Sequence, residues 1–198
     1  MQTVMQLENY SPASEITVLA VCFTMLMLLL VSFKVRMKSF RIFASTLTML
    51  IVATSSNLML HYLMEHAPDT PTWILYSLRS IYHFLLFAML HHYVAYTCEA
   101  TYLSKKRRKP FITAAVILLV VFSAIDIIGI WTGRSMRFIN GRLAFEGSTV
   151  FAIGYICFVA LIMLLLFRVR KRLYRQVMNG FFGVTVISLT IMIVSRLR

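Results

Sequence analysis

The sequence predicts an all-α fold: a polytopic bundle of six transmembrane helices with a small extracellular β-hairpin between the fourth and fifth helices. Of the 198 residues, 60% are hydrophobic and only 14% are charged, whereas a soluble domain averages about 25% charged residues. The apolar residues form long runs, which are typical of membrane-spanning helices. No internal repeat or low-complexity segment divides the chain, so residues 1–198 are expected to form a single transmembrane domain.

Six apolar runs define the expected helices, and short polar clusters separate them. The runs cover residues 16–33, 42–64, 72–97, 111–131, 149–167 and 181–194. All four prolines lie outside these runs: Pro12, Pro68, Pro71 and Pro110. Because proline breaks or kinks a helix, this distribution predicts helices that are mostly unbroken.

The segment between the fourth and fifth runs carries the hairpin signal. Residues 136–145 alternate in polarity around Asn140-Gly141. An Asn-Gly pair favours a type I′ turn, because both central positions of that turn need a positive φ. A small β-hairpin is therefore expected here, with an irregular polar loop as the alternative.

The net charge of +13 follows the membrane topology. Lys and Arg gather in three connections, within residues 34–41, 105–109 and 168–175. By the positive-inside rule these connections face the cytoplasm, which leaves the N-terminus extracytoplasmic and Trp73 and Trp131 at the outer membrane boundary. The chain is thus expected to be a multi-pass protein of the inner (plasma) membrane, with no nucleic acid as partner.

The last apolar run ends almost where the sequence ends. Six crossings from an outside N-terminus leave the C-terminus outside as well, and Arg198 follows the sixth run by only a few residues. A seventh helix would return the chain to the cytoplasm. We therefore expect this sequence to be the N-terminal part of a longer protein.

Polar and ionisable side chains inside the predicted spans form the candidate site. Such groups are costly in hydrocarbon, and they usually serve a function. Tyr76, Arg79 and His83 recur at i, i+3 and i+7, so they share one face of a helix. Six residues on three helices are the predicted ligand-binding residues: Asn57, His61, Tyr76, Arg79, His83 and Asp126.

Arg79 and Asp126 are expected to pair. At about 1.5 Å per residue, Arg79 lies roughly 9 Å below Trp73, and Asp126 lies roughly 7.5 Å below Trp131. The two charges therefore reach the same depth on consecutive antiparallel helices, with Asn57 and the two histidines nearby. Two interpretations stay open: a structural ion pair, and an outward-facing pocket in which Arg79 holds an anionic or polar group of a ligand.

The sequence carries no recognisable catalytic or cofactor motif. It has no Ser-His-Asp set, no HExxH and no glycine-rich phosphate loop, and no Lys lies inside a span. His91 and His92 point about 100° apart on a helix, so they do not chelate one ion together. Cys22, Cys98 and Cys157 have no metal-ligand spacing. We expect no enzyme activity of this chain, no cofactor and no metal site.

The outer turn and the fifth run are similar to a known family. The segment 140–147 reads Asn-Gly-Arg-Leu-Ala-Phe-Glu-Gly, and Phe151, Tyr155 and a basic connection over 168–175 follow it. This pattern resembles the N-terminal seven-transmembrane sensor regions of bacterial histidine kinases and cyclic-di-GMP synthases or phosphodiesterases. The resemblance covers the second to sixth runs. The chain departs from it in having neither a seventh helix nor an effector domain.

The expected function follows from the polar cluster and the resemblance together. It is a sensor or receptor module for bacterial signal transduction, which binds a small or lipid-like ligand at an outer-leaflet polar cluster and relays the signal to a cytoplasmic output domain. A small transporter or channel subunit and a structural assembly protein are the alternatives, and a cytoplasmic-face enzyme that acts on lipids through His91, His92 and the basic loops comes last. The expected partners are the lipid bilayer and that ligand, with a second copy of the chain, as a homodimer, as a further candidate.

Overall fold

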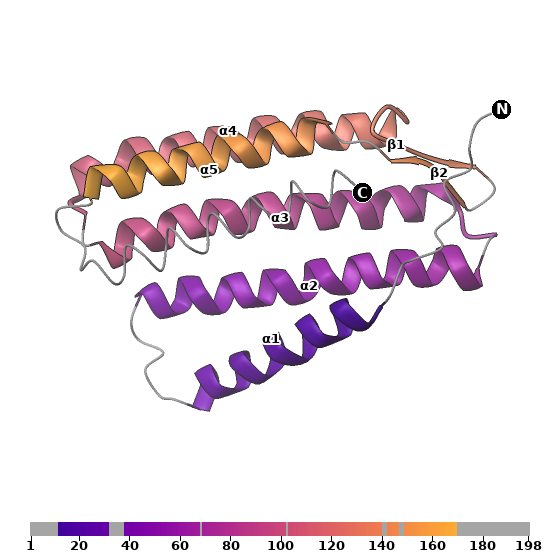
Figure 1. Cartoon of the computed structure of the whole chain (residues 1–198), viewed down its shortest axis with the longest axis horizontal. Coiled ribbons are helices and arrows are strands. Elements are labelled where there is room, and N and C mark those ends of the chain that lie inside the picture. The colour runs from indigo at the N-terminus through magenta and orange to yellow at the C-terminus, as the bar shows by residue number, and fades with distance from the viewer. Residues whose placement is uncertain are drawn as a thin grey trace.

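The protein forms an elongated helical bundle with a two-stranded sheet at one end (Figure 1). The computed structural model describes residues 12–31, 38–67, 69–101, 103–139, 142–146 and 149–169. Its elements are α1 (Ala13–Val31), α2 (Lys38–His66), α3 (Thr72–Ala100), α4 (Lys105–Trp131), β1 (Met136–Ile139), β2 (Arg142–Glu146) and α5 (Thr149–Val169). The sixth predicted helix, over 181–194, lies outside the described residues.

The helices α2 to α5 lie along the long axis of the molecule, and α1 crosses α2 obliquely at one edge (Figure 1). α3 is central, because it packs against α2 on one side and against α4 and α5 on the other. We call the end that carries β1 and β2 the hairpin end. The opposite end, where α4 begins with Lys105–Lys109 and α5 ends beside Arg168, is called the basic end.

Four of the described helices are long and apolar enough to cross a membrane. These segments are Phe40–His66, Thr72–Glu99, Lys105–Trp131 and Thr149–Val169, and α1 contributes a shorter apolar segment, Glu15–Leu28. A hydrocarbon core about 30 Å thick needs roughly 20 apolar residues in a helix. Large hydrophobic side chains also cover the outer face of α4, where Ile117, Val120 and Ile128 are more than half exposed. These features indicate a membrane protein.

α4 begins earlier than its apolar run. It starts at Lys105, so the predicted start near Phe111 is wrong and Pro110 lies inside the helix. The amides of Arg107 and Arg108 donate to the Ser104 carbonyl at 2.9 and 3.0 Å and form the first turn. Lys and Arg are good helix formers, and Pro110 in the second turn interrupts only one backbone hydrogen bond.

β1 and β2 pair antiparallel at the place where the sequence predicts a hairpin. Ile139 pairs with Arg142, and the two residues between them, Asn140 and Gly141, lie outside the described residues. The register shifts between Arg137 and Phe138, so that one extra residue is accommodated in β2 as a β-bulge. Met136 at the start of β1 is buried against α2 and α3, which attaches the sheet to the bundle.

Two apolar clusters fill the bundle at different levels. The first lies between α3, α4 and α5 toward the basic end: Phe87, Val94, Cys98, Leu103, Ala115, Phe158, Ile162, Leu165, Leu166 and Val169. The second lies at the hairpin end: Leu60, Met64, Leu75 and Met136. Gly154 brings α5 close to α3, because a Cβ there would lie 2.7 Å from Phe87 Cε1.

Candidate functional site

A layer of polar side chains crosses the bundle between the two apolar clusters. We call it the polar layer and define it by one residue each from α1, α2 and α4 and two from α3: Glu15, Asn57, Asp126, Arg79 and His83. Leu60 and Leu75 lie about one helical turn from it toward the hairpin end, and Phe87 lies one turn toward the basic end. All three of these apolar side chains are buried. The layer is therefore bounded by hydrophobic packing on both sides along the bundle axis.

One half of the polar layer is a chain of hydrogen bonds through α1, α2 and α3. Arg79 Nη1 donates to Asn57 Oδ1 at 2.9 Å, and Asn57 Nδ2 donates to Glu15 Oε1 at 2.6 Å. The Asn57 side chain thus accepts from the Arg79 guanidinium through its oxygen and donates to the Glu15 carboxylate through its nitrogen, and these two bonds fix the orientation of the amide. The guanidinium of Arg79 also lies 5.3 Å from the ring centroid of Tyr82, in a cation–π contact.

The other half joins α3 to α4. His83 Nδ1 lies 2.6 Å from Asp126 Oδ2, and the two side chains are 8% and 1% exposed. A carboxylate only accepts hydrogen bonds, so the imidazole is the donor. The ring of Phe151 on α5 packs against the imidazole with centroids 4.7 Å apart. Breaking this pair would leave a polar group buried without its partner.

The close partner of Asp126 is thus His83, whereas the sequence predicted Arg79. The reason is the rotation between the two α3 residues. Four residues along a helix turn by about 40° beyond a full circle, and Arg79 reaches α2 while His83 reaches α4. The predicted grouping of Arg79, Asp126, Asn57 and His83 in one cluster is therefore present, with different contacts inside it.

The two remaining predicted residues lie at the edge of the polar layer. His61 lies one turn from Asn57 on α2 and is half-buried. Tyr76 packs on Trp131 of α4, with ring centroids 6.0 Å apart. It also contacts the apolar cluster at the hairpin end. Tyr76 thus lies at the boundary of the polar layer, against the apolar cluster at the hairpin end.

Comparisons with protein-family models, curated proteins and solved structures found no match for this chain. The chemistry of the polar layer is therefore the main guide to function.

Sequence reasoning missed Glu15, Tyr82 and Phe151. Glu15 directly precedes the first apolar run, which begins at Ile16, so it lies outside the predicted span. The helix extends to Ala13, which carries Glu15 into the bundle. The available signal was a lone acidic residue directly before an apolar run, in a chain whose third run carries an arginine that needs a counter-charge.

Two cavities, of about 440 and 380 Å³, lie on other parts of the bundle, and neither is lined by a residue of the polar layer. In the described part of the chain, no group of three or more His, Cys, Asp or Glu is placed to hold a metal ion. The polar layer contains a half-buried cation, two carboxylates and an imidazole that connect four helices at one level.

Proposed function

We propose that this chain is the membrane-embedded sensor or receptor module of a bacterial signal-transduction protein, with the polar layer as the element that the stimulus changes. The observation that carries the proposal is the sharing of α3 between two polar connections. Arg79 links α3 to α2 and α1 through Asn57, and His83 links α3 to α4. The resemblance of segment 140–147 and the fifth run to seven-helix sensor regions supports the same class.

The mechanism is a population shift between two helix packings. Arg79 Nη1 donates to the neutral Asn57 amide, and an anionic ligand group is a stronger acceptor for a guanidinium than an amide is. A small or lipid-like anion that replaces the Asn57 amide as the acceptor for Arg79 releases α2 from α3. The His83–Asp126 pair meanwhile keeps α3 packed on α4. A ligand shifts the equilibrium only by its difference in affinity for the two packings, and that difference arises at Arg79.

The orientation completes the proposal. The cations Lys105–Lys109 and Arg168 all lie at the basic end, and the positive-inside rule assigns this end to the cytoplasm. The polar layer then lies in the outer half of an inner (plasma) membrane, with an extracytoplasmic N-terminus. A signal travels along α3 and its neighbours toward an output at the basic end.

Distance measurements between spin labels test the sensor function. Labels at Val52 on α2 and Val120 on α4 lie on exposed positions, and octanoate is a suitable amphiphilic carboxylate probe in nanodiscs. We expect octanoate to change the α2–α4 distance distribution in the otherwise unaltered chain and in Arg79→Lys, but not in Arg79→Gln. An unchanged distribution in all three proteins would remove the anionic-ligand mechanism.

A small proton-coupled transporter is the second candidate. Buried carboxylate and histidine pairs serve as proton relays in membrane transporters, and His83–Asp126 is such a pair. The purified chain in liposomes would then acidify the lumen when a solute gradient is imposed, and Asp126→Asn would abolish this flux. A sensor leaves the lumen pH unchanged in the same assay.

A further inference from the structure

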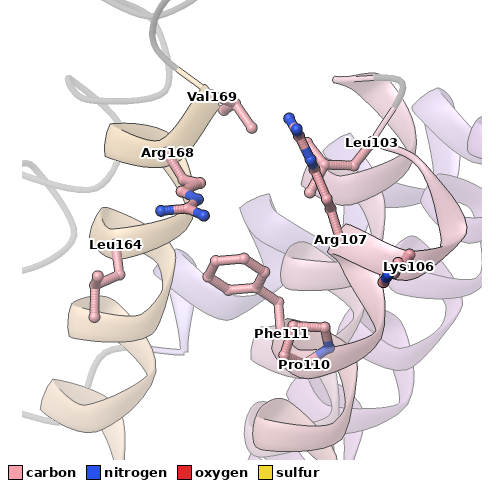
Figure 2. A pocket seen from close by; sticks show the side chains of 8 residues that line it. All are labelled: Leu103, Lys106, Arg107, Pro110, Phe111, Leu164, Arg168 and Val169. Carbon is pink, nitrogen blue, oxygen red and sulfur yellow. The ribbon is translucent and has the colours of Figure 1, made fainter.

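The larger of the two cavities described above lies at the basic end, between the start of α4 and the end of α5 (Figure 2). Its volume is about 440 Å³, and five apolar and three basic residues line it: Leu103, Pro110, Phe111, Leu164 and Val169, with Lys106, Arg107 and Arg168. The ring of Phe111 points into the gap, and Arg107 on α4 and Arg168 on α5 lie on its two sides (Figure 2). We call this cavity the basic pocket.

The cations of the basic pocket differ from their neighbour Arg108. Arg108 Nη1 lies 2.9 Å from Glu99 Oε2, so that charge is balanced within the bundle. Lys106, Arg107 and Arg168 are exposed and form no ion pair with another described residue. Like charges that face one gap repel one another, and an anion between them removes this repulsion. The pocket therefore favours a negatively charged occupant.

The position of the pocket identifies the kind of anion. α4 has 27 residues, and at about 1.5 Å per residue it is longer than a hydrocarbon core of about 30 Å. With its hairpin end at Trp131, its first turn reaches the level of the lipid headgroups. Leu164 below Arg168 is 65% exposed on the outer face of α5. The basic rim of the pocket thus continues directly into an apolar, lipid-facing wall.

We propose that the basic pocket binds the headgroup of an anionic phospholipid. Arg107 and Arg168 hold the phosphodiester oxygens, since the guanidinium fork matches phosphate in geometry and charge. Phe111 and Leu164 contact the first part of an acyl chain. Basic pockets between membrane helices bind anionic headgroups in this way. This site does not depend on the proposed sensor function.

Native mass spectrometry of the detergent-solubilised full chain tests the site. Dioleoyl phosphatidylglycerol is the probe, dioleoyl phosphatidylcholine is the zwitterionic comparison, and inorganic phosphate is the competitor. We expect phosphatidylglycerol to bind in preference to phosphatidylcholine and to resist competition by phosphate. In R107Q/R168Q its affinity should fall about thirtyfold, because each cation near an anionic headgroup contributes about 1 kcal/mol.

The matched control removes the same charge beside the pocket. Lys105 and Lys109 are exposed in the same helical turns but do not line the cavity. Affinity for phosphatidylglycerol in K105Q/K109Q should therefore fall less than about threefold, since exposed cations outside the contact contribute little. A second variant, L164W, keeps every charge and fills the apolar wall, and it too should weaken binding.

Four results would overturn the proposal. Equal losses in R107Q/R168Q and K105Q/K109Q would mean diffuse attraction by the whole basic end. Full competition by inorganic phosphate would mean a site for a free anion. Equal binding of phosphatidylcholine, or no lipid binding because another segment of the chain fills the cavity, would mean that no anionic lipid site exists.

Discussion

The polar layer and the basic pocket both contain charged side chains, but these differ in burial and in pairing. In the polar layer, Asp126 is 1% exposed and its carboxylate is held by His83 at 2.6 Å. In the basic pocket, Arg107 and Arg168 are exposed, and no described residue forms an ion pair with them. α4 contributes to both sites, and Asp126 follows Lys106 by 20 positions along this helix, which separates the two sites by about 30 Å.

The difference follows from the surroundings. A buried charge without a partner is strongly destabilising, so the polar layer has to complete its contacts within the protein. At headgroup level, water and lipid solvate a cation, so the basic pocket can remain open for a ligand. We therefore expect substitutions in the polar layer to change stability and helix positions. Substitutions in the basic pocket should change binding and leave stability unaltered.

The largest effect is expected from Asp126→Ala. It leaves the His83 imidazole buried without its acceptor, and breaking a buried pair costs about 3 kcal/mol. The free energy of unfolding in mixed micelles should fall by this amount. Ser123→Ala is the control, because Ser123 is equally buried one turn away and its hydroxyl has no hydrogen-bond partner among the described residues. Equal losses in both variants would contradict a specific role for the pair.

A smaller loss is expected from Gly154→Ala. The added Cβ would lie 2.7 Å from Phe87 Cε1 and 2.9 Å from Phe122 Cγ, so the rings below the polar layer have to move. Overpacking of this kind costs about 1–3 kcal/mol. Ala152→Gly is a useful comparison on the same helix, because it removes a methyl group at a half-buried position. If Gly154→Ala unfolds at the same denaturant concentration as the unaltered chain, this result contradicts a close contact between α5 and α3 at Gly154.

Asn57→Ala should cost less again. It removes the amide that connects Arg79 to Glu15. Because both of these partners are only half-buried, we expect a loss of about 1.5 kcal/mol, at the lower end of the range for hydrogen bonds to charged groups. The melting temperature should fall, whereas Ser55→Ala on the exposed side of the same helix should leave it unchanged. A melting temperature of Asn57→Ala equal to that of Ser55→Ala would show that the polar layer does not depend on this connection.

The smallest effect is expected at the basic end. Arg108→Gln breaks the pair with Glu99, whose side chains are 27% and 28% exposed, and pairs this exposed contribute about 0.5 kcal/mol. The loss should shrink as salt is added. Arg107→Gln, which lacks such a partner among the described residues, should not change the unfolding curve. If Arg107→Gln lowers stability as much as Arg108→Gln or more, the distinction between the paired cation Arg108 and the cations that line the basic pocket is wrong.

The sequence was sufficient for the helices but not for their ends. Hydrophobic runs located α1 to α5, because a bilayer-spanning helix needs a long apolar stretch. The ends extend into polar residues that also form helix, as Lys105–Lys109 do before Pro110. Composition alone does not separate such a basic helical turn from a basic loop.

The same limit applies to the candidate site. The helical spacing of the polar residues and their depth below the two tryptophans placed Asn57, Arg79, His83 and Asp126 at one level. Both quantities follow from the fixed rise and rotation of a helix. The pairing inside the cluster depends on how each helix is rotated about its axis, which the sequence does not specify. The sequence did not show that Glu15 joins the site, because this follows from where α1 begins. It did not show the basic pocket either, because the pocket is formed by the packing of α4 against α5.

The most direct test of the account is the α2–α4 distance distribution in Asp126→Asn, with spin labels at the exposed positions Val52 and Val120. If the polar layer sets the helix positions, neutralising Asp126 shifts this distribution while the helical content stays constant, and Ser123→Ala leaves it unchanged. Superimposable distributions in the unaltered chain, Asp126→Asn and Ser123→Ala would contradict the claim that the polar layer controls the helix packing.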